Sequence, residues 1–150
     1  MFIKKKDKLF FIEKYYKPEL PLNLTKYLFK FANSAIDISD GLIDDLSKMI
    51  NTQNLSFHLF EKKIPISNKL SNLIKNQRLN KINLVSNGDD YQVLFTANVN
   101  KTRIIQNVSK TTGIKITKIG KIVSGKDRSF IFDEKGKQIQ AKSKGYIHQF

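Results

Sequence analysis

The 150-residue sequence predicts an α+β fold, a mixed α/β architecture in which helices pack against a mixed β-sheet. Three observations lead to this prediction. Apolar residues recur at helical spacing in some segments and alternate with a period of two in others. These two kinds of segment are interleaved along the chain, and a hairpin pattern comes near its end. The length is that of one ordinary domain, so we expect one folded unit.

Residues 1–21 are expected to form a linker or arm, because Pro18 and Pro21 disfavour a helix. Over residues 22–35, apolar side chains recur at helical spacing and predict a helix. A second helix is expected after Asp40, which is well placed to be its N-cap. The apolar stripe of this second helix consists of Leu42, Leu46, Met49 and Ile50.

Residues 56–64 alternate in polarity and predict a strand that ends at Pro65. Ser67 follows in a position that suits the N-cap of another helix. Residues 86–90 are rich in turn formers and predict a loop. The almost continuously apolar residues 91–96 then indicate a central strand, covered on both faces and lying in the core.

The final part of the sequence predicts one more helix and a β-hairpin. Residues 100–110 carry a helical apolar stripe, and Gly113 lies where a C-cap would end that helix. Isoleucines over residues 114–122 suggest a strand that is bent near Gly120. A short alternating segment then leads into turn formers at residues 133–136 and predicts the hairpin.

The chain carries a formal net charge of +14, which first suggests a polyanionic partner. However, the lysines are spread along nearly the whole sequence, and no RNA-binding or zinc-finger signature is present. We therefore do not expect specific nucleic-acid binding. The lack of cysteine excludes disulfides and thiolate metal sites. No apolar run is long enough for a membrane helix, and we expect a soluble, cytoplasmic protein.

The scarce acidic residues are concentrated in two short segments. Six of the 13 acidic residues fall there, namely Asp37, Asp40, Asp44, Asp45, Asp89 and Asp90. In the first segment an extended piece meets a helix start, where backbone N–H groups favour anions. Mg²⁺ prefers carboxylate and phosphate oxygens and can join the two. The pattern alone also fits an ordinary helix cap at Asp40 and a solvated turn at Asp37.

The second acidic segment places Asp89 and Asp90 directly before the predicted central strand. Strand ends are common places for ligand sites in sheets of this kind. An ordinary turn at Asn87 and Gly88 that leads into a buried strand explains the segment equally well. The sequence has no glycine-rich phosphate loop, dinucleotide fingerprint or nucleophile elbow, so it does not support the common nucleotide and hydrolase folds.

Two short segments stand out when they are taken together. The first, at residues 35–42, reads Ala-Ile-Asp-Ile-Ser-Asp-Gly-Leu, and the second, at residues 88–96, reads Gly-Asp-Asp-Tyr-Gln-Val-Leu-Phe-Thr. Together they resemble signature segments of the C-terminal domain of thiamine-monophosphate kinases. Weaker resemblances occur at residues 64–67, at residues 116–120 and in the aromatic ending at residues 145–150. The resemblance implies the mixed sheet and flanking helices of the aminoimidazole ribonucleotide synthetase-like superfamily.

The resemblance further implies Mg²⁺-dependent transfer of the ATP γ-phosphate to thiamine monophosphate, which gives thiamine diphosphate. By motif match, Asp37 and Asp40 would be Mg²⁺ ligands, and Ser39 would contact ATP. Asp89 would face the thiamine substrate, and Tyr146 would stack on one of its rings. The match assigns no role to Asp44, Asp45 and Asp90.

The second segment departs from the family pattern, which usually reads Gly-Gly-Glu-Asp-Tyr-Glu. Asn87 replaces the first glycine, Asp89 replaces the first glutamate, and Gln92 replaces the last. Aspartate is one methylene shorter than glutamate. We therefore expect the substrate contact of Asp89 to be weaker or mediated by water.

The resemblance also implies an N-terminal domain that supplies further Mg²⁺ ligands, part of the nucleotide site and a homodimer interface. Residues 1–21 would be the arm from that domain, and residues 22–150 would be the C-terminal domain. We therefore expect this chain to be inactive without the other half. The apolar surface that meets this half is expected to include Phe2, Phe10, Phe11 and Ile12. The alternative is a non-catalytic ligand-binding or interaction module that retains the fold.

Overall fold

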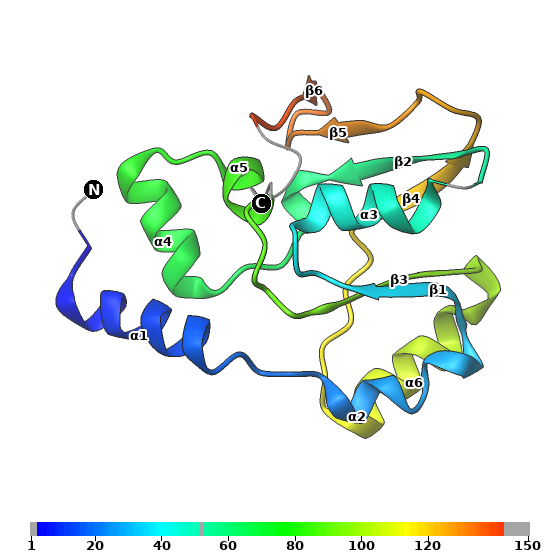
Figure 1. The fold of residues 1–150 in the computed structure, drawn as a ribbon, viewed down its shortest axis with the longest axis horizontal. Coiled ribbons are helices and arrows are strands. Elements are labelled where there is room, and N and C mark those ends of the chain that lie inside the picture. The colour runs from blue at the N-terminus through cyan, green and yellow to red at the C-terminus, as the bar shows by residue number, and fades with distance from the viewer. Residues whose placement is uncertain (1–2, 52, 143–150) are drawn as a thin grey trace, which may run out of the picture.

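Helices and strands are interleaved as far as α6 (Thr102–Thr112), and three strands follow it, in the described part of the chain, which comprises residues 3–51 and 53–142 of the computed structural model (Figure 1). The helices are α1 Lys5–Tyr16, α2 Leu22–Thr25, α3 Leu42–Ile50, α4 Asn68–Gln77, α5 Lys81–Val85 and α6 Thr102–Thr112. The strands are β1 Ala32–Asp37, β2 Leu55–Phe60, β3 Val93–Ala97, β4 Gly120–Ser124, β5 Phe130–Phe132 and β6 Gln138–Ile139. Short 3-10 turns are found at Leu28–Lys30, Glu61–Lys63 and Val99–Lys101.

Two sheets organise these elements. Strands β1 and β3 form an antiparallel pair, and the other four described strands form a sheet in the order β4, β2, β5, β6. In this larger sheet β2 and β5 run parallel, whereas the β2–β4 and β5–β6 pairs are antiparallel. The mixed sheet, the flanking helices and the late hairpin of β5 and β6 confirm the predicted fold class.

Helix α3 lies between the two sheets and joins their cores (Figure 1). Its helical apolar spacing puts Leu42, Leu46 and Ile50 on one buried face. These side chains belong to one cluster with Leu59 of β2 and Leu94 of β3. The start of α3, and the acidic segment that precedes it, are therefore fixed against both sheets.

A second, smaller core lies against α2 and α6. It is built on Leu24, Phe31 and Val108, and the ring centroids of Phe31 and Phe95 are 5.1 Å apart. Because successive side chains of a strand point to opposite faces, β3 contributes Phe95 to this core and Leu94 to the first. The predicted helix and C-cap of this region are confirmed as α6, which ends with Gly113 in the left-handed conformation.

The helix predicted over residues 22–35 is wrong beyond its first turns. Helix α2 ends at Thr25, and residues 32–37 form strand β1 instead. The side chains of β1 alternate between half-buried and exposed, and its backbone pairs with β3. The hydroxyl groups of Ser34 and Thr96 lie 2.9 Å apart across this pair. Pairing with a distant strand therefore outweighs a local helical pattern that Asn and Ser make weak.

Three further expectations need correction. The strand expected over residues 56–64 ends at Phe60, because its partner β4 begins only at Gly120, opposite Leu59. The residues before Gly120 form no strand, since Ile114 and Ile116 pack in the second core while Ile119 packs in the first. Strand β3 pairs with β1 alone in the described residues, so it is not central. Helix α5 was not predicted.

The predicted arm over residues 1–21 contains helix α1, which ends before Pro18. Pro18 and Pro21 therefore lie after this helix and do not prevent it from forming. None of the side chains of α1 is buried. An ion pair joins this helix to the body, from Asp7 to Lys69 of α4, with 3.3 Å between Oδ1 and Nζ. Whether this arm connects to a further domain stays a prediction.

The predicted N-cap of α4 is confirmed and gives a simple test of local stability. The Ser67 hydroxyl accepts a hydrogen bond from the backbone N–H of Leu70, at 3.1 Å. Ser67→Ala is expected to lower the free energy of unfolding by about 1 kcal/mol, because this N–H loses its partner. Urea denaturation followed by circular dichroism measures the change. Asn72→Ala, in the same helix, is the control and should cause no loss, since alanine favours helices.

Candidate functional site

The two acidic segments meet beyond the paired ends of β1 and β3. The backbone N–H of Ile38 donates to the carbonyl of Gln92 at 2.9 Å, and the N–H of Tyr91 donates back to the carbonyl of Ile38 at 2.8 Å. The N–H of Asp89 donates to the carbonyl of Ser39, also at 2.9 Å. The segments that resemble two family motifs are thus joined directly through their backbones.

Two glycines allow this close approach. Gly41 has a φ of 123°, and a Cβ at this position would lie 2.3 Å from the carbonyl oxygen of Ser86. Gly88 has a φ of 86°, and a Cβ there would lie 2.3 Å from the carbonyl oxygen of Ser39. The first segment therefore lies backbone against backbone with the loop of residues 86–90 at two places where a side chain does not fit.

Asp45, to which the sequence assigned no role, is buried beneath the first segment and is 1% exposed. Its Oδ2 atom accepts hydrogen bonds from three successive backbone N–H groups. These donors are Ser39 at 3.0 Å, Asp40 at 3.0 Å and Gly41 at 3.1 Å. A concave row of N–H groups of this kind is suited to an anion, and here a carboxylate of the same chain is that anion.

The expectation that Asp40 caps α3 is therefore wrong. Gly41 occupies the N-cap position, and no side-chain hydrogen bond is made from there. Asp45, one turn into the helix, instead accepts from the N–H groups of Ser39, Asp40 and Gly41, which lie just before the first helical turn. Because these three N–H groups are bonded to Asp45, they are not open to a phosphate. The N–H groups of the first turn of α3, which the sequence indicates as suited to an anion, are different ones, and that expectation stays a prediction.

Asp40, Asp44 and Asp45 form the one group of three potential metal ligands found within the described residues, with oxygen atoms within 4.8 Å of one another. Lys48 lies among them. Its Nζ atom is 2.5 Å from Asp40, 2.7 Å from Asp44 and 3.5 Å from Asp45. Hydrogen bonds to Asp40 and then to Asp44 raise the pKa of Lys48, so it is cationic at neutral pH. We call these four residues the Asp–Lys cluster.

The predicted metal ligand Asp37 lies at the end of β1, opposite Val93, and is exposed. It is not a member of the Asp–Lys cluster, whereas Asp40 is. The predicted ATP contact Ser39 is half-buried. Its backbone N–H donates to the Asp45 carboxylate, and its carbonyl accepts from the N–H of Asp89. The structure thus brings Ser39 and Asp40 against the second segment and leaves Asp37 at its solvent-facing edge.

The predicted substrate residue Asp89 is exposed, and its carboxylate accepts a hydrogen bond from the Tyr91 hydroxyl at 3.2 Å. This bond raises the pKa of Tyr91. Asp89 and Tyr91 both have positive φ angles, 59° and 49°, which are uncommon outside glycine and concentrate at functional sites. Tyr146, the other predicted substrate contact, lies outside the described residues.

Asp90, the remaining carboxylate of the second segment, keeps part of its surface exposed. Nearby protein atoms that displace water, and then the charge of Asp89, raise the pKa of Asp90. Adjacent carboxylates of this kind are electrostatically unfavourable unless a cation balances them. The site therefore concentrates negative charge on a chain that is strongly basic.

A signal for Asp45 was present in the sequence. Leu42, Asp45, Leu46 and Met49 follow the spacing of one helical face, so Asp45 lies on the apolar stripe of α3. A carboxylate on a buried helical face must find donors, because an unpaired buried charge is costly. Lys48 lacked such a signal, since lysines are frequent throughout this chain.

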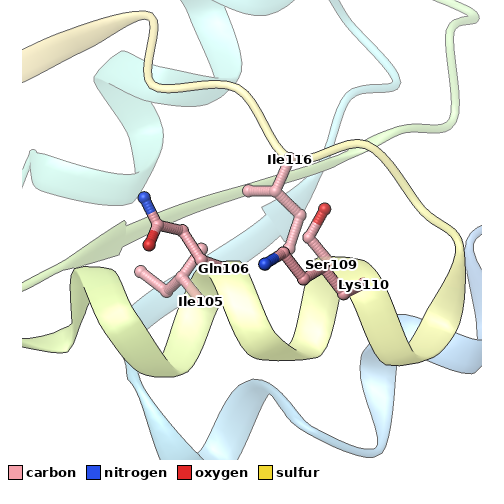
Figure 2. A pocket seen from close by; sticks show the side chains of 5 residues that line it. All are labelled: Ile105, Gln106, Ser109, Lys110 and Ile116. Carbon is pink, nitrogen blue, oxygen red and sulfur yellow. The ribbon is translucent and has the colours of Figure 1, made fainter.

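The described surface also has a hollow of about 380 Å³ between α6 and the segment that follows it. Figure 2 shows its lining side chains rising from α6 toward Ile116. The lining residues are Ile105, Gln106, Ser109, Lys110 and Ile116. None of them belongs to either acidic segment, and the Ser109 hydroxyl already donates to the carbonyl of Ile114 at 2.7 Å. This hollow is not part of the candidate site.

Comparison with known sequences gives a consistent set of relatives. A thiamine-monophosphate kinase of Buchnera aphidicola subsp. Acyrthosiphon pisum is 35% identical over 143 residues, which are 93% of this chain and 42% of the relative. The thiamine-monophosphate kinase of Escherichia coli K12 is 27% identical over 143 residues, 95% of this chain and 43% of the relative. No protein-family model matches the sequence.

The solved structures that resemble this chain also include thiamine-monophosphate kinases. AaThiL complexed with AMPPCP and TMP superposes with a TM-score of 0.74 and 25% identity, covering 99% of this chain and 44% of that protein. Thiamine-monophosphate kinase from Stenotrophomonas maltophilia gives a TM-score of 0.75 at 24% identity, covering 93% and 42%. The hydrogenase maturation protein HypE of Escherichia coli, at 12% identity and a TM-score of 0.65, covers 89% and 44% and shares the fold alone.

The mixed sheet, its helices and these neighbours define a domain of the aminoimidazole ribonucleotide synthetase-like class. Within that class, the chain is a homologue of the thiamine-monophosphate kinases over 93% of its own length. This agrees with the family that the two acidic segments indicate. The chain spans less than half the length of the curated relatives it matches. None of the described helices is long and apolar enough to cross a membrane.

Proposed function

We propose that this chain is the C-terminal domain of a thiamine-monophosphate kinase and contributes to Mg²⁺-dependent transfer of the ATP γ-phosphate to thiamine monophosphate. The observation that carries the proposal is the direct backbone pairing of the two family-like segments, through Ile38, Ser39, Asp89 and Tyr91. The homologous AaThiL complex contains AMPPCP and TMP, which supports a nucleotide and a thiamine phosphate as ligands. The cysteine-free composition suits the cytoplasm.

The donor atoms in the first segment fit Mg²⁺, since the ion prefers hard oxygen ligands and commonly uses one or two carboxylates with phosphates. Asp37 and Asp40 would hold it, and it would neutralise charge that develops on the transferred phosphate. The Ser39 hydroxyl, which makes no hydrogen bond within the described residues, would contact the nucleotide. Asp89 and Tyr146 would bind thiamine monophosphate. Phosphoryl transfer depends chiefly on such positioning and charge neutralisation.

We also infer that residues 1–21 lead to an N-terminal domain, or meet a second subunit, that completes the active site of a homodimeric enzyme. The apolar side chains of α1 support this inference, because they are solvent-exposed here. The exposed fractions are 58% for Leu9, 41% for Ile12, 59% for Tyr15 and 75% for Tyr16. Of the residues predicted for this surface, Phe10 and Phe11 are half-buried and Phe2 lies outside the described residues.

The test is to measure thiamine diphosphate formation by the full chain alone and after addition of a separately expressed N-terminal domain from the Buchnera aphidicola relative. The chain alone is expected to give no product, and the mixture is expected to restore it. A tethered version, in which both parts form one chain, controls for weak association. Robust product from the chain alone would contradict the inferred dependence on a second half. Absence of product from both mixture and tethered version would contradict the kinase proposal.

A second candidate is a non-catalytic binding or interaction module. The observation that favours it is Lys48, which already pairs with the predicted metal ligand Asp40. Titration calorimetry with thiamine monophosphate and with Mg²⁺-ATP separates the candidates. Heat of binding for either ligand supports the kinase-derived site, and no heat for both, with the N-terminal domain present, supports the interaction module.

A further inference from the structure

The backbone of residues 39–41 is fixed from two opposite directions. On one side, the loop of residues 86–90 packs against it, with the N–H of Asp89 donating to the Ser39 carbonyl and the Ser86 carbonyl facing Gly41 without room for a Cβ. On the other side, the buried Asp45 carboxylate binds the three N–H groups. The first contact is made by backbone, and the second depends on a single side chain.

Asp45 is linked to Asp40 by a second route. While its Oδ2 atom binds the N–H groups, its Oδ1 atom faces Lys48 at 3.5 Å. The same Nζ atom lies 2.5 Å from the Asp40 carboxylate. Asp45 therefore acts on Asp40 both through its backbone N–H and, with Lys48 between them, through its side chain. Hydrogen bonds to a charged acceptor are stronger than neutral ones, so both links lose strength if the charge is removed.

We propose that Asp45 is a positioning residue of the phosphate-transfer site, which sets the backbone of residues 39–41 and aims the Asp40 carboxylate at a Mg²⁺-phosphate ligand. The inference rests on the proposed kinase function. Asp45 is 1% exposed and does not reach the ligand itself, so it acts only through its neighbours. Residues behind a metal ligand commonly control metal affinity in this way.

Asp45→Asn is the informative variant, because it keeps the size of the side chain and replaces charge-assisted bonds with weaker neutral ones. Asp44→Asn is its matched control. Asp44 lies on the same helix and pairs with Lys48 at 2.7 Å, yet within the described residues no backbone N–H donates to its carboxylate. The two variants lose the same charge beside the same lysine, and they differ in the bonds to residues 39–41.

The first measurement is amide hydrogen exchange by NMR on the full chain, and it needs no activity. Asp45→Asn is expected to speed exchange at Ser39, Asp40 and Gly41 about tenfold, the equivalent of about one hydrogen bond's net stabilisation. Asp44→Asn should change these amides less. Equal exchange in the two variants would overturn the role of Asp45 in setting this backbone.

The second measurement is the Mg²⁺ concentration that gives half-maximal product formation in the complex with the N-terminal domain. Asp45→Asn is expected to raise this concentration about 10- to 100-fold over wild type. The assay is run at a temperature well below the melting temperature of the variant, so that the variant is folded. A purely structural residue would lower the melting temperature without moving the Mg²⁺ requirement. A shift no larger than that of Asp44→Asn would overturn the inference. If wild type forms no product but exchange changes as expected, the kinase proposal fails while the backbone role of Asp45 stands.

Discussion

Gly41→Ala is expected to lower the free energy of unfolding by about 3 kcal/mol or more, through backbone strain and overlap together. The backbone of Gly41 has φ 123° and ψ 148°, close to a region that essentially only glycine adopts. The new Cβ would also lie 2.3 Å from the carbonyl oxygen of Ser86, and that oxygen belongs to backbone that cannot swing away like a side chain. A loss of this size is a large share of the stability of an ordinary domain.

The control for this prediction is Gly113→Ala. Gly113 also has a positive φ, 69°, but nothing lies within 4 Å of where its Cβ would be. Its substitution should therefore cost only about 1 kcal/mol, the usual penalty for the left-handed conformation. Urea denaturation of both variants gives the comparison. If Gly41→Ala loses no more than Gly113→Ala, the backbones of Gly41 and Ser86 do not approach as closely as described.

Local chemistry was enough to predict the elements whose ends are set by nearby residues. Ser67 caps α4 through the N–H three positions later, and Gly113 ends α6 in the left-handed conformation. The turn at residues 133–136 likewise returns the chain from β5 to β6. In each case the decisive contact spans only a few residues, so the sequence pattern contains it.

The elements that were predicted wrongly depend on distant partners. Residues 32–37 became a strand because β3, some 60 residues later, supplies the ladder and the Thr96 hydroxyl. Residues before Gly120 could not form a strand because they cross between two cores, and the sequence does not show where those cores lie. The residue pattern within a short stretch of sequence contains no information about pairing with a strand far along the chain.

The candidate site also has a part that the sequence predicts and a part that only the folded chain shows. The motifs predicted that residues 35–42 and 88–96 act together, and the backbone bonds from Asp89 and Tyr91 show that they lie in contact. The roles of Asp37, Ser39, Asp40, Asp89 and Tyr146 stay predictions. Lys48 was not found, because its importance comes from a three-carboxylate arrangement that exists only in the folded chain. The place of Asp45 on the apolar stripe of α3 was a usable signal, but its backbone partners are set by the fold.

Asp37→Asn is expected to lower product formation by the complex with the N-terminal domain about a hundredfold or more, because a charge that stabilises phosphoryl transfer is lost. Stability should hardly change, since Asp37 is exposed and lies outside the Asp–Lys cluster. Asp40→Asn should reduce activity similarly and also weaken the pairing with Lys48, so its melting temperature should fall as well.

The control for these variants is Asp127→Asn. Asp127 is exposed and has a φ of 60°, a conformation that asparagine accepts readily, and it lies outside both acidic segments. This substitution removes the same charge from the chain, so it corrects for any general effect of net charge on ligand binding. Rates are measured as thiamine diphosphate formed at saturating Mg²⁺-ATP. If Asp37→Asn stays as active as Asp127→Asn, Asp37 does not hold the metal, and the ligand set must be sought around Asp40 alone.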